Sequence, residues 1–203
     1  MSTVPARRLT PEEYLAIERS ASVKSEFYRG EMFAMSGASY VHNRIQSNLV
    51  HRLNQLLEGS PWQVVGSDMR VCVSATGLYT YPDAVVFCGP PEFVDSQADT
   101  LTNPKVLFEI LSDSTEAYDR GEKAKQYRSM ASLHEYVLIS QKSPLVEVFQ
   151  RQPDGTWSLS EADRLEGIIA CGSLGITIPL SQIYALVAFP GDARLRLVDE
   201  HAG

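Results

Sequence analysis

Two carboxylates stand in stretches of the chain that are otherwise apolar. Asp83 directly precedes the run Ala84–Cys88, and Glu109 is the only charge in the run Val106–Leu111. Both runs have the composition of buried strands, where a carboxylate is costly to desolvate unless a cation, a metal ion or strong hydrogen-bond donors meet it. If the two strands are neighbours, the carboxylates can converge on one point, and two hard oxygen ligands suit Mg²⁺ or Mn²⁺.

A helix that supplies a cation is predicted after the second strand, over Tyr118–Met130. Asp119, Lys123 and Tyr127 recur every four residues, which places them on one face of that helix. Lys125 lies on a different face of the helix. Two carboxylates for a divalent metal ion and a nearby lysine form an apparatus for metal-assisted phosphodiester hydrolysis. In that hypothesis the metal activates a water, and the lysine orients this water or stabilises the developing negative charge.

Four short pieces of this region form a recognisable pattern: Tyr81–Asp83, Phe108–Ser112, Ser114–Thr115 and Asp119–Lys123. They resemble the Uma2 family of endonucleases, which belongs to the PD-(D/E)XK restriction-endonuclease-like superfamily. The similarity extends over residues 9–189. It implies an α/β fold with a restriction-endonuclease-like mixed β-sheet core flanked by helices, with additional N-terminal and C-terminal β-hairpins, and a metal-dependent endonuclease activity.

The resemblance also implies roles for individual residues. Asp83 and Glu109 would bind Mg²⁺ or Mn²⁺, with the carbonyl of Ile110 as a further ligand, and Lys123 would assist catalysis. The chain departs from the superfamily motif at Leu111, which stands where that motif has its lysine. In the Uma2 family the lysine lies on the following helix, at a position that resembles that of Lys123.

Further polar side chains are candidates for supporting or substrate-contacting roles: Glu26, His42, Ser112, Asp119 and Tyr127. Tyr127 would anchor the lysine or contact a phosphate. His42 is either a surface or capping side chain or a group facing the metal site, because the equivalent position in the family often carries histidine. Ser112 begins a polar cluster that can be a turn and helix cap instead of a chemical group.

The elements that must position these residues are readable from turn and cap signals. Thr10 followed by Pro11 predicts the start of a short helix. Residues 25–35 predict a β-hairpin that turns at Arg29–Glu31. A helix is expected over Tyr40–Glu58, with an apolar stripe of Ile45, Leu49, Leu53, Leu56 and Leu57.

Strands and loops complete the expected order. Strands are predicted at Gln63–Val65, Asp68–Val73, Glu135–Ile139, Leu145–Phe149 and Thr156–Leu159, and the last two form a hairpin around the turn at residues 152–155. Residues 90–104 are expected to be a loop. Asp68 and Arg70 should share one face of their strand, and an ordinary ion pair with a residue across from them is expected there.

Size and composition favour a single domain. The chain has 203 residues and a hydrophobic content of 44%, which predicts one well-filled domain over 9–189 with flexible tails at 1–8 and 190–203. Its apolar runs fall short of the roughly 20 residues that cross a membrane, and its N-terminus lacks a secretory signal. A cytoplasmic protein without membrane contact is expected. Three scattered cysteines, Cys72, Cys88 and Cys171, indicate small buried side chains instead of disulfides or a zinc site.

The net charge of -7 is unusual for a protein that binds phosphates. The acidic residues concentrate in residues 61–118 and after residue 151, which leaves room for a local basic rim. Its candidate members are Arg44, Arg52, Arg120, Lys123, Lys125 and Arg128. The resemblance to the Uma2 family implies nucleic acid, with DNA first, as the partner, and related nucleases imply a homodimer.

Two other functions stay open at this point. The chain can be a catalytically silent nucleic-acid-binding or protein-interaction module that retains the nuclease fold. It can also be a metal-dependent hydrolase of a smaller phosphoester.

Overall fold

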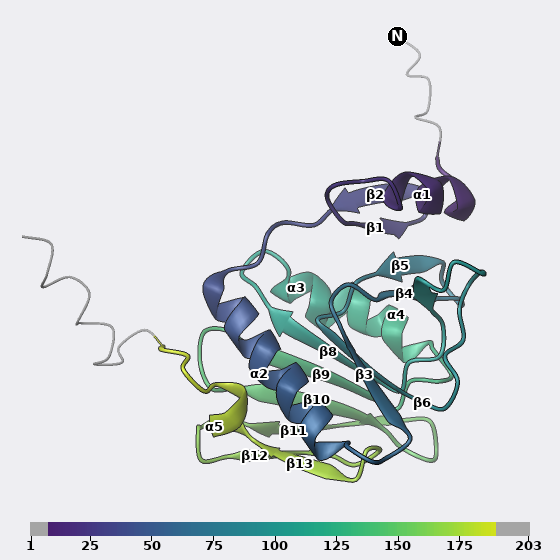
Figure 1. The fold of residues 1–203 in the computed structure, drawn as a ribbon. Helices are drawn as coiled ribbons and strands as arrows, with labels where there is room; N and C mark the ends of the chain where they lie inside the picture. Colours follow the sequence, from purple (N-terminus) through teal and green to yellow (C-terminus); the bar gives the residue numbers. More distant parts are fainter. Residues whose placement is uncertain (1–7, 190–203) are drawn as a thin grey trace, which may run out of the picture.

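A six-stranded mixed sheet lies at the centre of the computed structural model, which describes residues 8–189 (Figure 1). In order across the sheet, its strands are β11 (Trp157–Ala162), β10 (Val146–Arg151), β9 (Glu135–Ser140), β8 (Val106–Leu111), β6 (Ala84–Cys88) and β3 (Trp62–Gly66). β8 and β9 run parallel, and the other neighbouring pairs run antiparallel. The predicted mixed sheet is confirmed, and the predicted tails lie outside the described residues except for Arg8.

A second sheet of five strands packs beside the first. Its order is β2 (Glu31–Ala34), β1 (Ser25–Tyr28), β5 (Leu78–Thr80), β4 (Arg70–Val73) and β7 (Thr100–Leu101). The predicted N-terminal hairpin is confirmed as β1 and β2, with Arg29 and Gly30 both at positive φ in its turn. The predicted loop at residues 90–104 was wrong in one place, because β7 pairs in parallel with β4.

Both predicted C-terminal strands form the hairpin β10–β11. A further hairpin follows that the sequence pattern did not reveal, made of β12 (Ile168–Cys171) and β13 (Ile176–Pro179). The short helix α5 (Leu180–Ile183) comes directly after it. Cys72 and Cys171 are buried as predicted, whereas Cys88 is partly exposed.

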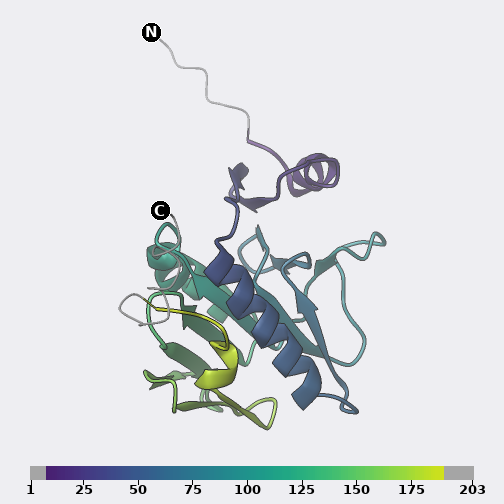
Figure 2. The ribbon, with the colours of Figure 1, turned by 60° about the vertical axis from the view of Figure 1, so that its left-hand side comes forward.

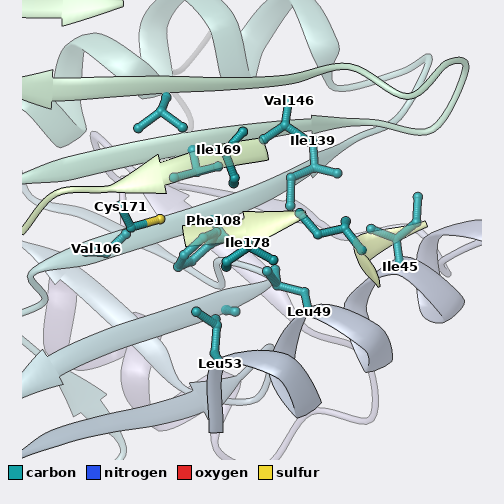
Figure 3. Close-up of a cluster of buried hydrophobic side chains, with 14 of the residues drawn as sticks. Ile45, Leu49, Leu53, Val106, Phe108, Ile139, Val146, Ile169, Cys171 and Ile178 are labelled. Atoms are coloured by element: carbon teal, nitrogen blue, oxygen red, sulfur yellow. The ribbon is translucent and has the colours of Figure 1, made fainter. Parts of the chain in front are cut away.

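Helix α2 (Tyr40–Leu56) crosses one face of the central sheet, as Figures 1 and 2 show from two directions. The side chain of Ser39 caps it by accepting a hydrogen bond from the backbone N–H of His42. Its predicted apolar stripe is confirmed, since Ile45, Leu49 and Leu53 are fully buried. Figure 3 shows these side chains against residues of the sheet and of the C-terminal hairpin, including Phe108, Ile139 and Ile178.

The opposite face of the sheet is covered by a segment that departs from the predicted single helix. It contains α3 (Glu116–Tyr118), a π-helical turn η1 (Asp119–Lys123) and α4 (Ala124–Arg128). A π turn holds one more residue than an α-helical turn and often lies at a functional site. Its Asp119 and Lys123 are both buried, so the wider turn places two charged side chains under the sheet.

The alternation of side chains along β8 separates its two faces. Val106, Phe108 and Ile110 belong to the apolar cluster beneath α2, whereas Leu107 and Leu111 belong to the cluster beneath α4. Successive strand residues point to opposite faces. Glu109 therefore points toward the face that η1 and α4 cover. Helix α1 (Pro11–Glu18) lies beyond β1 with the capping box that Thr10 and Glu13 predict.

No helix among residues 8–189 combines the length and the apolar character needed to cross a membrane.

The predicted start of the strand at Asp68 was wrong, because β4 begins at Arg70 and leaves Asp68 outside it. Asp68 forms an ion pair with Lys24. The buried Arg70 forms an ion pair with Asp99, at 3.0 Å between Nη2 and Oδ2. Asp99 also accepts a hydrogen bond from Arg19, at the end of α1, at 2.7 Å. One aspartate thus joins α1 to the second sheet.

Asp99 should make folding stability depend on pH at the acid end. Hydrogen bonds from Arg19, and more weakly the charge of Arg70, hold the pKa of Asp99 well below its ordinary value. Because the folded-state pKa is the lower one, this stabilisation is present above the unfolded pKa of about 3.9 and is lost as the pH falls through the folded-state pKa. Asp99→Asn should therefore lower the free energy of unfolding at pH 7 more than at pH 2, as measured by urea unfolding.

Asp163→Asn is the matched control, since Asp163 is exposed and pairs with its exposed neighbour Arg164. An equal stability loss for Asp99→Asn at both pH values would contradict this role of Asp99.

Candidate active site

Glu109 meets a cation and a hydroxyl at the same carboxylate oxygen. The side chain is almost fully buried, and its Oε1 lies 2.9 Å from the Nζ of Lys123. The hydroxyl of Tyr127 donates a hydrogen bond of 2.7 Å to this oxygen. Both contacts use Oε1, which leaves Oε2 available to a ligand. Tyr127 thereby contacts the carboxylate, and its fully buried ring also lies under Lys123, at 5.8 Å from Nζ to the ring centroid.

Lys123 is surrounded by three carboxylates from three elements. Its Nζ lies 2.9 Å from Glu26 of β1, 2.9 Å from Glu109 of β8 and 3.5 Å from Asp119 of the π turn. Burial alone would lower the pKa of Lys123, but the surrounding negative charges outweigh burial and hold this pKa well above its usual value. Lys123 is therefore an ammonium group at neutral pH. It can donate hydrogen bonds and stabilise negative charge, but it cannot act as a general base.

Glu26 is the residue through which the second sheet contacts the site. Its Oε1 accepts a hydrogen bond from the hydroxyl of Thr80 on β5 in addition to the contact with Lys123. Thr80 is fully buried. Glu26 could be predicted as a polar residue beside the hairpin turn, but Thr80 could not, since a threonine in a strand is ordinary.

Asp83 lies one residue before β6 and continues the pairing of β6 with β8. Its Oδ2 accepts a hydrogen bond of 2.7 Å from the backbone N–H of Ile110, and its own N–H donates to the carbonyl of Phe108. Its Oδ1 lies 2.8 Å from Nε2 of His42. The carboxylate therefore sits at the open end of the β6–β8 pair, between the backbone of β8 and helix α2.

Of the two readings of His42, the structure supports the one in which its ring faces the site. Only its backbone N–H belongs to the cap of α2; the ring contacts Asp83. One helical turn later, Gln46 donates a hydrogen bond of 2.8 Å to the carbonyl of Asp83. Gln46 was not among the predicted site residues, although its spacing of four from His42 was a usable signal.

Asp83 and Glu109 influence each other without sharing a partner. Burial raises the pKa of Glu109 well above its ordinary value, and the negative charges of Asp119 and Asp83 raise it further, against the lowering effect of Lys123. Burial likewise raises the pKa of Asp119. One of the Asp119 oxygens, Oδ1, lies buried without a hydrogen-bond partner. The site thus holds more negative charge than its own lysine neutralises.

This excess of negative charge fits a divalent cation. Within residues 8–189, no three His, Cys, Asp or Glu side chains form a ready cage for a metal ion. Mg²⁺ does not require such a cage, because proteins usually hold it by one or two carboxylates and leave several waters in place. Asp83, directly before β6, and Glu109, on the adjacent strand β8, meet that requirement.

Ser112 is not brought to this cluster. Its hydroxyl lies 2.9 Å from the hydroxyl of Thr115 and accepts a hydrogen bond from the backbone N–H of Thr115. These contacts are those of the predicted turn and cap. Arg120 of the predicted basic rim is likewise occupied, because it pairs with Glu116 and Glu147.

Comparisons with known proteins agree with this architecture. Residues 11–181 match the family model Uma2, described as "Putative restriction endonuclease". Two uncharacterized proteins of Synechocystis sp. are 37% and 34% identical to this chain, over 79% and 92% of its length and over 91% and 97% of theirs. A crystal structure described as a putative nuclease belonging to DUF820, from Anabaena variabilis, has the same fold.

That structure aligns with a TM-score of 0.71 and 18% identity, and it covers 89% of this chain and 99% of its own. At this identity the likeness bears on the fold alone. The family model, in contrast, spans both strands that carry the carboxylates and the turn that carries the lysine. From this match we conclude that the chain belongs to the Uma2 family of restriction-endonuclease-like proteins.

Proposed function

We propose that this protein is a divalent-metal-dependent endonuclease that hydrolyses phosphodiester bonds in nucleic acid, with DNA as the first substrate to test. One observation carries the proposal. Glu109 on β8 forms an ion pair with a buried lysine that its surroundings keep protonated, and Asp83, directly before the adjacent strand β6, accepts a hydrogen bond from the backbone of β8 one residue beyond Glu109. Membership of the family supports the nuclease class.

Asp83 and Glu109 would hold the metal ion, with the carbonyl of Ile110 as a further ligand. A bound Mg²⁺ or Mn²⁺ supplies Lewis acidity toward the phosphate and lowers the pKa of a water. The contacts around both carboxylates suit this role. His42 and the N–H of Ile110 orient Asp83, and Tyr127 fixes Glu109 through Oε1. Such outer contacts typically set the direction and basicity of metal ligands.

Lys123 would stabilise the negative charge that develops on the phosphate. Its three carboxylate neighbours hold the ammonium in one place, so little reorganisation is needed when the substrate arrives. Because Lys123 stays protonated, the water must lose its proton to another acceptor. Glu26 and Asp119 then serve to anchor the lysine instead of contacting the substrate.

A silent module that retains the fold is the alternative, and one observation favours it. The ammonium of Lys123 already neutralises part of the charge of Glu109, as it would in a purely structural ion pair. Metal binding separates the two functions, because the enzyme requires it and the silent module does not. Activity on nucleotides alone would instead assign the site to a smaller phosphoester. A homodimer also remains to be tested, by sedimentation.

Metal binding should depend on both strand carboxylates. Calorimetric titration with Mn²⁺ should show one binding event for the wild-type protein, and Asp83→Asn and Glu109→Gln should each abolish it, because each removes a charged oxygen ligand. Asp113→Asn is the control, since Asp113 is exposed and pairs with Lys142. Unchanged Mn²⁺ binding in both variants would reject the ligand assignment, and a wild-type protein that binds no Mn²⁺ would favour the silent module.

Lys123 should affect cleavage without affecting metal binding. Lys123→Met should lower kcat for plasmid or single-stranded DNA by about 10²- to 10³-fold, as expected when one preorganised stabilising donor is lost. Lys123→Arg should retain more activity, because it keeps the positive charge among the three carboxylates. Lys105→Met, at a lysine directly before β8 and outside the predicted basic rim, should cleave at the wild-type rate.

Thermal melting checks that the Lys123 variants fold. A folded Lys123→Met protein that cleaves as fast as the wild type would remove Lys123 from the mechanism while leaving the metal ligands untouched.

A further inference from the structure

Gln141, directly after β9, joins three segments beside the candidate active site. Its Nε2 donates a hydrogen bond of 2.8 Å to the carbonyl of Leu111, the last residue of β8. Its Oε1 accepts a hydrogen bond of 2.7 Å from the hydroxyl of Ser39, which caps α2. Its Nε2 also lies 3.5 Å from Nδ1 of His42. The side chain therefore ties the ends of β8 and β9 to the first turn of α2.

The contact with Leu111 fixes which end of the amide faces His42. A backbone carbonyl only accepts hydrogen bonds, so the group next to it must be the NH2 of Gln141. An amide NH2 carries two hydrogens, and while one is donated to Leu111, the second is available to the ring nitrogen of His42. The contact with Ser39 agrees, because there the amide oxygen is the acceptor. Gln141 therefore presents a donor to Nδ1 of His42.

A donor at Nδ1 decides which nitrogen of His42 carries the hydrogen. In a neutral imidazole one nitrogen donates and the other accepts. Since Nδ1 accepts from Gln141, the hydrogen is on Nε2, which lies 2.8 Å from Oδ1 of Asp83. The opposite tautomer would place two donors face to face at Nδ1 and two acceptors face to face at Asp83. A hydrogen on both nitrogens would still oppose two donors at Nδ1.

Asp83 then accepts a hydrogen bond at each of its two oxygens. Oδ1 receives the Nε2–H of His42, and Oδ2 receives the backbone N–H of Ile110. A carboxylate has about four acceptor sites, so each oxygen keeps one for a metal ion. Both ring nitrogens of His42 are occupied in this arrangement. His42 is therefore an orienting donor and does not accept the proton that the attacking water loses.

We propose that Gln141 is a positioning residue, which holds His42 in the tautomer that donates to Asp83 and thereby directs that carboxylate toward a metal ion. Gln141 acts through His42 and contacts neither the metal ion nor the substrate. The effect on the tautomer is independent of the proposed function, whereas the effect on metal binding rests on it.

Two-bond ¹H–¹⁵N correlation spectra report the tautomer, because a ring nitrogen that carries a hydrogen and one that does not differ in ¹⁵N shift. The spectra are recorded at pH 8, above the ordinary histidine pKa of about 6.5, and His42→Asn identifies the signals of His42. In the wild-type protein Nε2 should carry the hydrogen. Gln141→Leu should give a mixture of both tautomers. Gln141→Glu, of nearly the same shape, should place a hydrogen on Nδ1, because a carboxylate only accepts.

Calorimetric titration with Mn²⁺ measures the consequence for Asp83. Gln141→Leu should weaken Mn²⁺ binding by about 10-fold without changing the number of sites, the lower end of the range for a residue behind a metal ligand. Gln63→Leu is the matched control, because Gln63 on β3 also donates a hydrogen bond of 2.8 Å to a backbone carbonyl, that of Gly89. Its His42 spectrum and its Mn²⁺ affinity should equal those of the wild type. Thermal melting shows whether each variant folds.

The outcomes separate this inference from the proposed function. A hydrogen on Nδ1 in the wild-type protein, or a wild-type His42 spectrum in Gln141→Leu, overturns the role of Gln141 even if the protein cleaves DNA. Altered spectra with wild-type Mn²⁺ affinity would make the amide a purely structural contact and also overturn it.

A wild-type protein that binds no Mn²⁺, with His42 spectra that change as expected in both Gln141 variants, rejects the nuclease and supports the control of His42 by Gln141. If Gln141→Leu does not fold, Gln141→Glu decides, since a bare Nδ1 in that variant contradicts the proposal.

Discussion

A single buried ammonium group holds the candidate active site together. Lys123 is the shared partner of carboxylates from the N-terminal hairpin, the central sheet and the π turn. Burying an ion costs several kcal/mol unless its partners are well placed, and leaving one partner alone is costlier still. The hairpin, the strand β8 and the turn must therefore adopt their positions together. The same arrangement leaves surplus negative charge, because one amine faces Glu26, Glu109 and Asp119 with Asp83 close by. If the proposed metal ion binds here, stability and metal affinity arise from the same cluster.

The strand that carries Glu109 was the easiest element to predict. β8 matches the predicted run at both ends because its residues are covered on both faces and leave an uninterrupted apolar signal. In that setting a charge is conspicuous, so Glu109 and its need for a cation could be inferred from one residue. The spacing of Asp119, Lys123 and Tyr127 identified the side chains that meet Glu109, although the helix that carries them is not regular. Local patterns thus identified the residue types and the face.

What the pattern could not show depends on contacts between distant segments. The π turn, the strand β7 and the hairpin β12–β13 have weak local signals, and each is fixed by what it packs against. Asp99 lies in a polar stretch that looks like a loop, and only folding brings it to Arg19 and Arg70. A residue at the start of a helix can turn its ring either way, so His42 had two readings. Strand pairing decides between them by placing Asp83 opposite that helix.

Because of the π turn, the number of residues in its segment decides where the side chains of the candidate site point. An α-helix rotates by about 100° for each residue. Deleting one residue between Asp119 and Tyr127 would therefore turn the side chain of Lys123 away from β8, even if Asp119, Lys123 and Tyr127 were all kept. The turn at residues 152–155 lies at the end of a hairpin and has no such constraint. Insertions and deletions in this family should therefore accumulate in hairpin turns and be excluded from residues 119–127. Within those nine positions, spacing is as much a requirement for the fold and its site as identity.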